Sequence, residues 1–344
     1  MALLPFSWVY AGLVWLRNWA YDAGLFVERR VGVPVISVGN MTAGGTGKTP
    51  FVELLIRRLL QRNQKVAVIS RGYGRQSKGT VIVSDGRKVQ VPGDVAGDEP
   101  YQIAKKFPSV VVVVDERRSR GARLAIEQFG VTAIVLDDGF QHRSLARECD
   151  IVMLNGATSL RHTRLLPSGL RRELMSGLQR ADLLVCSEEN KMDVLQEEIK
   201  EWSDVPIVSV KTVAVHLRGV QTMTVRSLQE LKGSGCVAFC GIGNPPAFRE
   251  TLERLGVTIH TFITYADHHR YSSADIERII AETQKYDHAL LITTEKDYMR
   301  LEHMLQESPQ MCSILHVLEI ETQLTNGSAI VDDCIDRTLK RVAA

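Results

Sequence analysis

Short runs of β-branched residues alternate with helix-like stretches over the first two hundred residues of the chain. Alternation of this kind predicts a parallel sheet with helices on both faces. Residues 79–91 interrupt the alternation with two short strand-like segments around Asp85-Gly86, which is a hairpin signal. The predicted strands are residues 34–38, 65–70, 110–115, 132–136, 150–154 and 182–186, and the predicted helices are residues 50–62, 99–106, 118–129 and 192–202.

A second series of alternating strands and helices extends from about residue 211 to residue 319. The boundary between the two series, near residues 206–216, lies in a stretch that itself has the pattern of an extended strand. The tail, residues 328–342, has a helical pattern and can pack back on either domain. The predicted strands of the second series are residues 237–241, 258–262, 289–293 and 313–317, and its predicted helices are residues 246–255, 273–284 and 296–306.

The chain opens with an apolar segment, residues 2–16, which carries no charge and is closed by Arg17. It lacks the basic start and the cleavage site of a signal peptide. It is also shorter than the roughly 20 residues that a membrane-spanning helix needs. Tryptophan with flanking arginine is typical of a helix that lies in the lipid interface, and a buried first helix is the alternative. The residues of this kind are Trp8, Trp15, Trp19, Arg29 and Arg30.

Composition narrows the classes of function. The 344 residues suffice for one large or two modest domains. The formal net charge is only +2, which disfavours a genome-wide nucleic-acid binder, so we expect no nucleic-acid partner. The six cysteines form no CxxC pair and no zinc-like spacing with histidine, which suits a reducing cytosol. No obligate protein partner is evident.

The strongest chemical signal lies between a predicted strand and a predicted helix, the context that a P-loop requires. Glycines there let backbone N–H groups surround phosphate oxygens, and the helix N-terminus adds partial positive charge. We expect Lys48 to reach the β- and γ-phosphates of ATP and Thr49 to ligate Mg²⁺. The first glycine of the usual GxxxxGK[ST] pattern is replaced by Thr42. The segment reads Thr42-Ala43-Gly44-Gly45-Thr46-Gly47-Lys48-Thr49.

Two acidic segments accompany this loop. The apolar run of residues 132–136 ends in Asp137 and Asp138, the Walker B arrangement, in which one carboxylate holds Mg²⁺ directly or through water. Asp98 and Glu99 stand just before or at the start of a predicted helix, where simple N-capping is one explanation. In a kinase, Asp98 instead takes the proton of the acceptor hydroxyl and Glu99 contributes to the metal site.

Arginines gather in residues 71–75 and residues 161–172, and Arg118 opens a predicted helix. Arginines on loops at strand ends suit phosphate or phosphosugar binding, although for any single one a solvated loop is the simpler explanation. In the second series, residues 267–272 contain two adjacent histidines without a third metal ligand, so acid–base work or plain loop structure is expected. Residues 293–297 are explained by helix capping.

Together these motifs resemble those of tetraacyldisaccharide 4′-kinase, the lipid A kinase family of Gram-negative bacteria. The resemblance implies an α/β fold with a P-loop NTPase-type parallel sheet flanked by helices, and a second, smaller α/β domain. Thr42 fits the family pattern. The implied parts are a membrane-interface helix (1–30), a P-loop kinase domain (31–210), a smaller α/β domain (211–320) and a C-terminal helix (321–344). The matching segments are residues 38–50, 70–75, 97–100, 136–142, 166–173, 239–244 and 267–272.

The resemblance also implies an activity: transfer of the γ-phosphate of ATP to the 4′-hydroxyl of tetraacyldisaccharide 1-phosphate in lipid A biosynthesis. It implies Mg²⁺, a lipid-linked disaccharide substrate, and a peripheral or monotopic protein at the cytoplasmic face of the bacterial inner membrane. Asp98 would be the catalytic base, supported by His268. The metal set would be Thr49, Glu99, Asp137 and Asp138, and the nucleotide or substrate contacts would be Tyr73, Arg118, His142 and Arg172.

A membrane-associated P-loop regulatory or assembly ATPase is the alternative from a different class, and a nucleotide-binding module without catalysis is a further one. The Asp98-Glu99 pair and the Asp267-His268 segment favour the kinase. Phosphate release discriminates between them, because an ATPase hydrolyses ATP without an acceptor whereas a kinase needs the lipid for fast turnover.

Overall fold

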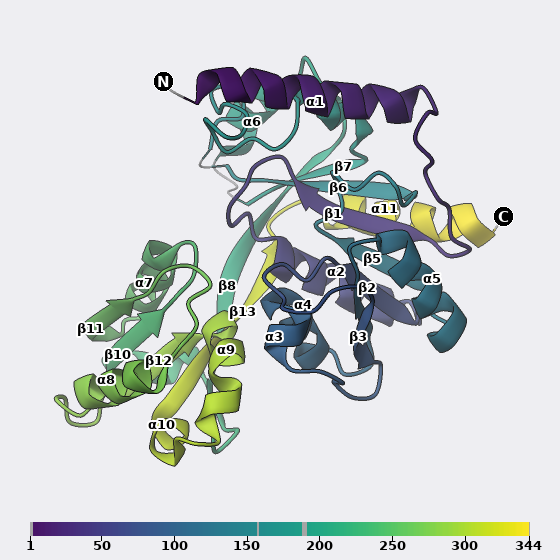
Figure 1. Ribbon diagram of the computed structural model, residues 1–344. Helices are drawn as coiled ribbons and strands as arrows, with labels where there is room; N and C mark the ends of the chain where they lie inside the picture. Colours follow the sequence, from purple (N-terminus) through teal and green to yellow (C-terminus); the bar gives the residue numbers. More distant parts are fainter. Residues whose placement is uncertain (1–2, 157, 188–190, 344) are drawn as a thin grey trace. The chain divides into compact units, whose positions relative to one another are not determined.

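The computed structural model describes residues 3–156, 158–187 and 191–343. The chain divides into two compact units, each an α/β assembly, which confirms the predicted fold class (Figure 1). Unit 1 comprises Met1–Thr212 and Thr322–Ala344, and unit 2 comprises Val213–Glu321. The chain passes between the units along β8 (Ile207–Gly219) and again along β13 (Leu315–Leu324).

Unit 1 is built on a sheet with the strand order β8-β7-β6-β1-β5-β2-β4-β3. Its neighbouring strands are parallel, except that β3 is antiparallel to β4. The central strands are buried along their whole length, as expected where helices cover both faces of a parallel sheet. The strands are β1 (Val35–Asn40), β2 (Val66–Ser70), β3 (Val81–Asp85), β4 (Val111–Val114), β5 (Ala133–Asp137), β6 (Cys149–Leu154) and β7 (Leu183–Cys186).

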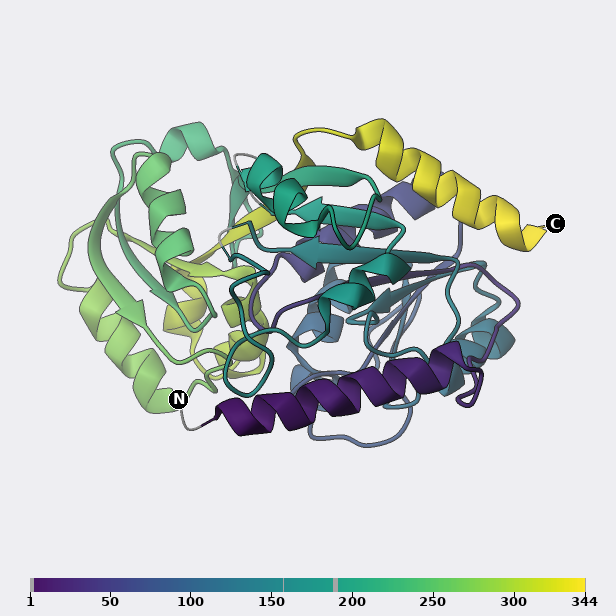
Figure 2. The same ribbon diagram turned by 90° about the horizontal axis from the view of Figure 1, so that it is seen from above.

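Helices cover this sheet, with α2 packed on β1 and β5 and with α5 packed on β2 and β4. Ala122 and Ala125 of α5 are fully buried in a core with Ile69 and Val113. α1 and α11 run along opposite sides of unit 1 (Figure 2). The helices are α1 (Leu4–Asp22), α2 (Lys48–Gln61), α3 (Gly93–Ala96), α4 (Asp98–Lys106), α5 (Arg118–Phe129), α6 (Met192–Ile199) and α11 (Ser328–Ala343), with a 3₁₀ helix η1 (Met175–Arg180).

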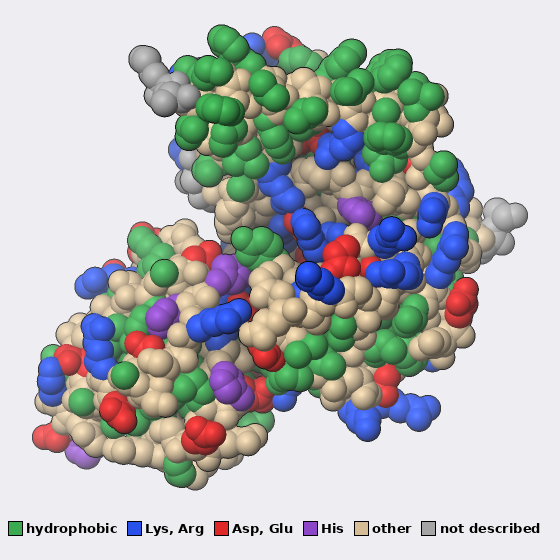
Figure 3. Space-filling model, viewed as in Figure 1, with side chains coloured by type: hydrophobic (Ala, Val, Ile, Leu, Met, Phe, Trp, Pro, Cys, Tyr) green, Lys and Arg blue, Asp and Glu red, His purple; other side chains and the backbone are tan. Residues whose placement is uncertain are grey.

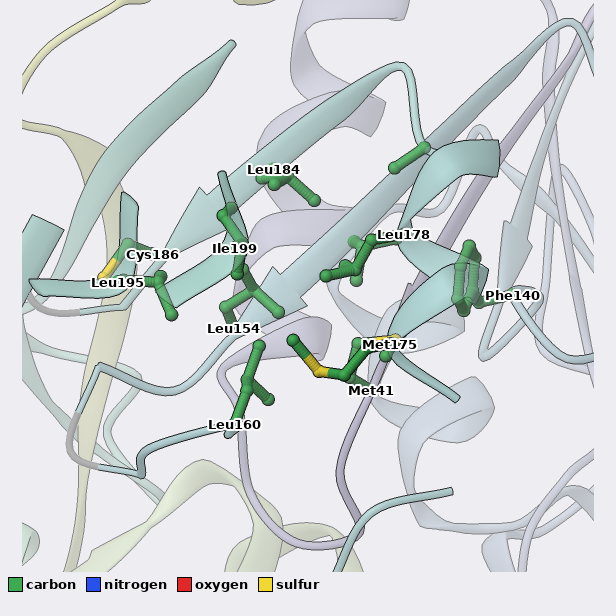
Figure 4. Close-up of a cluster of buried hydrophobic side chains, with 12 residues drawn as sticks. Met41, Phe140, Leu154, Leu160, Met175, Leu178, Leu184, Cys186, Leu195 and Ile199 are labelled. Carbon is green, nitrogen blue, oxygen red and sulfur yellow. The ribbon is translucent and has the colours of Figure 1, made fainter. Parts of the chain in front are cut away.

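A second core cluster of unit 1 anchors the loop that follows β1. Met41, the first residue after β1, is fully buried among side chains from β6, β7, η1 and α6 (Figure 4). The same cluster includes Leu154, Leu178 and Leu184. Because protein cores are close-packed, this contact limits the positions that the start of the loop can take.

The C-terminal helix α11 packs on β1 and β6 of unit 1. Arg62 directly follows α2 and binds two acids of α11. Its Nη2 lies 2.8 Å from Asp332 Oδ1, and its Nε lies 2.7 Å from Asp336 Oδ1. The sulfurs of Cys149 and Cys334 lie 2.7 Å apart, and the cysteines of the described residues are free thiols. The tail therefore packs on the first of the two predicted domains and contacts the helix that follows the P-loop.

Unit 2 has the strand order β11-β10-β12-β13, with parallel pairs throughout, and β9 pairs antiparallel with β8. Thr294 caps α9 by accepting the N–H of Asp297, which confirms the predicted capping role. The elements are β9 (Val225–Arg226), η3 (Leu228–Leu231), β10 (Gly235–Cys240), α7 (Pro245–Arg254), β11 (Thr258–Thr264), α8 (Ser273–Thr283), β12 (Leu290–Thr294), α9 (Glu295–Leu305) and α10 (Pro309–Ile314).

Two element predictions hold only in part. The predicted hairpin around Asp85 forms, with an antiparallel bridge between Ser84 and Val89 and a hydrogen bond from Gln90 N to the carbonyl oxygen of Val83 at 2.8 Å, but only its first arm, β3, is a full strand. The strand predicted from residue 313 begins at Leu315, because Pro309 at the first turn of α10 favours a short helix up to Ile314. Pairing with β4 therefore stabilises the first arm of the hairpin, and the proline at the start of α10 shifts the start of the strand.

Candidate active site

The loop between β1 and α2 has the backbone of a P-loop. Gly44 and Gly47 have φ angles of 111° and 74°, a region that favours glycine because it has no Cβ. α2 begins at Lys48, directly after Gly47. Thr42 takes no positive φ and forms an isolated bridge with Arg171, so a side chain is accommodated where the usual pattern has glycine.

Asp138, directly after β5, binds two cations. Lys48 Nζ lies 2.6 Å from Asp138 Oδ1. Arg172 Nη1 lies 2.9 Å from the same oxygen, and both terminal nitrogens of Arg172 lie 3.2 Å from Oδ2. Arg172 Nη1 also donates to Asn40 Oδ1 at 3.0 Å. Although burial raises the pKa of Asp138, Lys48 and Arg172 lower it well below its usual range, so this carboxylate is ionised.

Asp137, the last residue of β5, is buried and accepts a hydrogen bond from Ser70 Oγ at 3.0 Å. Burial raises the pKa of Asp137 to about 6, and repulsion from Glu99 and then from Asp138 contributes to the rise. Glu99, in the first turn of α4, is therefore close enough to act on β5. The N-cap position of α4 is Gly97, which has no side chain, so Asp98 does not serve as the N-cap.

Two glycine-containing loops set the position of α4. Gly97 has a φ of 90°, and a Cβ there would lie 3.0 Å from the carbonyl oxygen of Tyr73. Gly72 has a φ of 68°, and a Cβ there would lie 2.6 Å from the carbonyl oxygen of Ala96. The loop after β2 and the start of α4 thus approach each other more closely than side chains would permit. The Tyr73 side chain points outward and is 71% exposed.

Arg118 and His142 lie near the same acids. Arg118 is 5% exposed, and its Nε is buried without a hydrogen-bond partner among the described residues. Burial lowers the pKa of Arg118, against the attraction of Asp138. Burial, followed by repulsion from Arg118, Arg147 and Arg71, lowers the pKa of His142 to about 4. His142 is therefore a neutral ring at physiological pH.

The predicted histidine site lies in unit 2, on the loop between β11 and α8. His268 has a φ of 58°, and its Nδ1 lies 3.3 Å from Arg300 Nη2. His269 is engaged differently: its Nε2 lies 3.2 Å from Asp275 Oδ2, and its ring stacks on Tyr265 with a centroid distance of 4.4 Å. His269 is thus part of the loop structure. The partnership of His268 with Asp98 of unit 1 stays a prediction.

The chain matches the family model of tetraacyldisaccharide-1-P 4′-kinase over residues 1–340. A tetraacyldisaccharide 4′-kinase of Desulfotalea psychrophila is 37% identical over 313 residues, which cover 89% of each chain. A second, of Chlorobium limicola, is 34% identical over 345 residues, which cover 98% of this chain and 97% of the relative. The chain belongs to the tetraacyldisaccharide-1-P 4′-kinase family.

A solved structure supports the same assignment. The crystal structure of LpxK from Aquifex aeolicus in complex with ATP superimposes with a TM-score of 0.81 at 33% identity, over 98% of both chains. The predicted kinase is thus confirmed, and the alternative of a regulatory or assembly ATPase is not favoured. The ATP in that structure supports the prediction that ATP is the cofactor of this chain.

The sequence patterns missed two side chains of the candidate site. Asn40 and Ser70 each end an apolar strand, and each contacts a predicted site residue. A polar residue at the carboxyl end of a buried parallel strand is the signal that could have found them. Two arginines of the predicted basic clusters have other partners: Arg75 binds Glu116, and Arg171 donates to the carbonyl oxygen of Leu160 at 3.2 Å.

We expect His142 to make the fold less stable in acid. Its folded pKa of about 4 lies below the roughly 6.5 of an unfolded histidine, so the unfolded chain binds more protons between these values. Stability therefore falls as the pH is lowered through this window. His142→Gln should flatten the fall in urea midpoint from pH 7 to pH 4.5, and exposed His162→Gln is the matched control. An unchanged slope in the His142 variant would contradict the shift.

Proposed function

We propose that this kinase transfers the γ-phosphate of ATP to the 4′-hydroxyl of tetraacyldisaccharide 1-phosphate, a lipid A precursor. The observation that carries the proposal is the convergence of Lys48 and Arg172 on Asp138, beside the acids of β5 and α4. Phosphoryl transfer needs cations for the phosphates, acids for a metal ion and a base for the acceptor. Unit 1 supplies groups of all three kinds.

In this proposal the nucleotide phosphates lie in the loop of residues 42–49, where backbone N–H groups and the start of α2 favour negative charge. Lys48 exchanges part of its contact with Asp138 for the β- and γ-phosphates. Arg172 remains on Asp138 and Asn40 and extends its positive charge toward the transferred group. Because Arg172 carries two terminal nitrogens, it can hold a carboxylate and a phosphate oxygen together.

Thr49, Glu99, Asp137 and Asp138 are the groups proposed to hold Mg²⁺, and their hydroxyl and carboxylate chemistry suits the ion, although the described residues show no cluster of three acidic side chains already spaced to hold a metal. Repulsion among Glu99, Asp137 and Asp138 contributes to the raised pKa of Asp137, and a divalent cation would offset that repulsion. Hydroxyl and carboxylate oxygens are the ligands that Mg²⁺ prefers, with water and substrate phosphates completing its shell. When bound, the ion neutralises charge on the phosphate oxygens. Lys48, bound to Asp138, then keeps the phosphates in a fixed position relative to the acids.

Asp98 is the proposed catalytic base. It occupies the first turn of α4, where the helix dipole favours an ionised carboxylate. An ionised carboxylate accepts the proton of the 4′-hydroxyl as the oxygen attacks the γ-phosphorus. His268 of unit 2 orients Asp98, and hinge closure brings the two together around bound substrates.

Four further residues are proposed to contact nucleotide or substrate. The buried Nε of Arg118, which has no partner among the described residues, fits a phosphate oxygen. Neutral His142 offers a hydrogen bond without adding charge, and its ring nitrogen lies 2.9 Å from Ser144 Oγ. The exposed ring of Tyr73 offers an aromatic surface to a sugar or base, and Arg172 contacts the transferred phosphate.

We further propose that α1 holds the kinase peripherally on the cytoplasmic face of the inner membrane. Large apolar side chains gather along α1 (Figure 3), and Trp8 and Trp15 are 73% and 59% exposed. Exposed apolar patches of this kind mark interaction surfaces, and tryptophan suits the lipid interface. The buried side of α1 includes the polar residues Ser7 and Asn18. No helix in the described part of the chain has the length and apolarity to cross a bilayer.

Lys48→Ala should lower transfer from labelled ATP to the disaccharide 1-phosphate lipid by about 10²–10³-fold, the usual effect of removing one group that stabilises a developing oxyanion. Lys65→Ala, which removes an exposed lysine at the start of β2, is the control and should keep the parent rate. Near-normal turnover of the Lys48 variant would exclude the P-loop as the active site.

Asp98→Ala should lower kcat by about 10²–10⁴-fold, the usual effect of a general base, with little change in ATP affinity. His268→Ala should also lower kcat, and the double variant should lose much less than the product of the two losses, because groups that act as a unit are non-additive. Asp94→Ala and His303→Ala remove exposed residues of the same types and serve as controls. Multiplicative losses in steady-state kinetics would show independent roles.

Replacing Trp8 and Trp15 by serine should reduce pelleting with anionic phospholipid vesicles and reduce turnover on lipid substrate, while ATP binding stays unchanged. Trp202→Ser, at a residue that is 37% exposed, is the control. Substitution is preferred to deletion of α1, because deletion removes Arg17 and Asn18 from the buried carboxylate of Glu173. Vesicle binding equal to that of the parent protein would refute the membrane role.

A further inference from the structure

A buried carboxylate organises the loops around the end of β10 in unit 2. Asp297, in the first turn of α9, is 0% exposed. Its Oδ1 accepts hydrogen bonds from Tyr271 Oη at 2.8 Å and from Gly241 N at 3.0 Å. Its Oδ2 accepts one from Thr294 Oγ1 at 2.6 Å. Capping of α9 uses the backbone N–H of Asp297, so capping alone does not explain this carboxylate.

Arg300 connects Asp297 with the predicted catalytic histidine. Arg300 Nη1 lies 3.2 Å from Asp297 Oδ1 and donates to the carbonyl oxygen of Gly241 at 2.7 Å. Its Nη2 lies 3.3 Å from His268 Nδ1, and its side chain is only 7% exposed. The carbonyl oxygen of Gly241 also accepts the backbone N–H of His268 at 3.2 Å. The ring and the main chain of His268 are therefore held by one set of groups.

The contact between Arg300 and His268 determines which ring nitrogen carries the proton. A guanidinium has donors only, so His268 Nδ1 must be the acceptor. In the neutral ring the proton then resides on Nε2. Protonation of Nδ1 would oppose two donors and place an imidazolium against a guanidinium. Asp267 Oδ2, at 4.0 Å from Nε2, lies on the side where the ring carries its proton.

We propose that Arg300, held by Asp297, is a positioning residue that fixes His268 as the neutral tautomer with its proton on Nε2. His268 then donates a hydrogen bond from Nε2 to a carboxylate and does not itself take the sugar proton. The identification of that carboxylate as Asp98 rests on the proposed function. The division of work follows: Asp98 removes the proton, and His268 orients the Asp98 carboxylate by donating to one of its oxygens.

Nitrogen NMR tests the tautomer without reference to catalysis. The full-length protein is labelled with ¹⁵N at its nine histidines, and the His268 signals are identified by their loss in His268→Gln. We expect a bare Nδ1 and a protonated Nε2 near neutral pH. Arg300→Met should remove this preference, whereas Arg254→Met, at an exposed arginine of α7, should leave it intact. A protonated Nδ1 in the parent protein would overturn the proposal.

Kinetics test the positioning role. Arg300→Met should lower kcat by about 10–100-fold, the effect typical of losing the partner that orients a functional histidine, and the KM for ATP should stay unchanged. Arg300→Lys keeps a donor and should recover part of kcat together with the Nε2 proton on His268, whereas a merely structural role predicts recovery of kcat without any link to the tautomer. Parent-like kcat in Arg300→Met, with an impaired His268→Gln, would refute the positioning role.

Two further results separate this inference from the proposed function. Full turnover of His268→Gln would overturn the catalytic role of His268 and, with it, the kinetic role of Arg300. The nitrogen spectrum decides the tautomer whether or not His268 is needed for turnover. If Arg300→Met does not fold, Arg300→Lys and the spectrum of the parent protein decide. A Lys variant with the parent's spectrum and most of its kcat supports the proposal, and one that loses the Nε2 proton preference yet keeps the parent's kcat overturns it.

Discussion

The pair of cations on Asp138 is the interaction on which the candidate active site of this kinase depends. Lys48 begins the helix after the P-loop and Arg172 comes from a distant loop, yet both bind this one carboxylate. Removing either would leave a partly buried charge with one cation, which is costly in a low-dielectric site. The same ion pairs keep Asp138 ionised beside Asp137, whose pKa is raised. The P-loop, the end of β5 and the Arg172 loop are therefore held in one arrangement.

Arg172 also connects this arrangement with the helix that carries the exposed tryptophans. The next residue, Glu173, is 0% exposed and accepts hydrogen bonds from Arg17 and Asn18 of α1, each at 2.8 Å. A buried carboxylate needs such partners, which explains the presence of the polar residue Asn18 on the buried side of α1. The position of α1, which is the proposed membrane contact, and the contact of Arg172 with Asp138 thus depend on the same short loop.

Patterns of neighbouring residues in the sequence predicted the fold and those parts of the candidate site whose residues are adjacent in the chain. Buried β-branched runs and helical segments predicted the strands of the unit 1 sheet, and α5 has the predicted bounds, Arg118–Phe129. The P-loop and the Asp137-Asp138 pair were visible because their residues are adjacent. Contacts between distant residues were not: Arg172 and Asn40 are 132 residues apart, and Asn18 and Glu173 are 155 apart. Only the folded chain shows which polar residue meets which.

Each unit orders its own part of the candidate site. The cations and acids of unit 1 are fixed by Asp138, and His268 is fixed within unit 2 by Arg300 and Asp297. Because both parts are ordered by folding, a closure that joins them would cost little further conformational entropy. Proton removal from the sugar would then be tied to the closed state, which limits loss of the γ-phosphate to water.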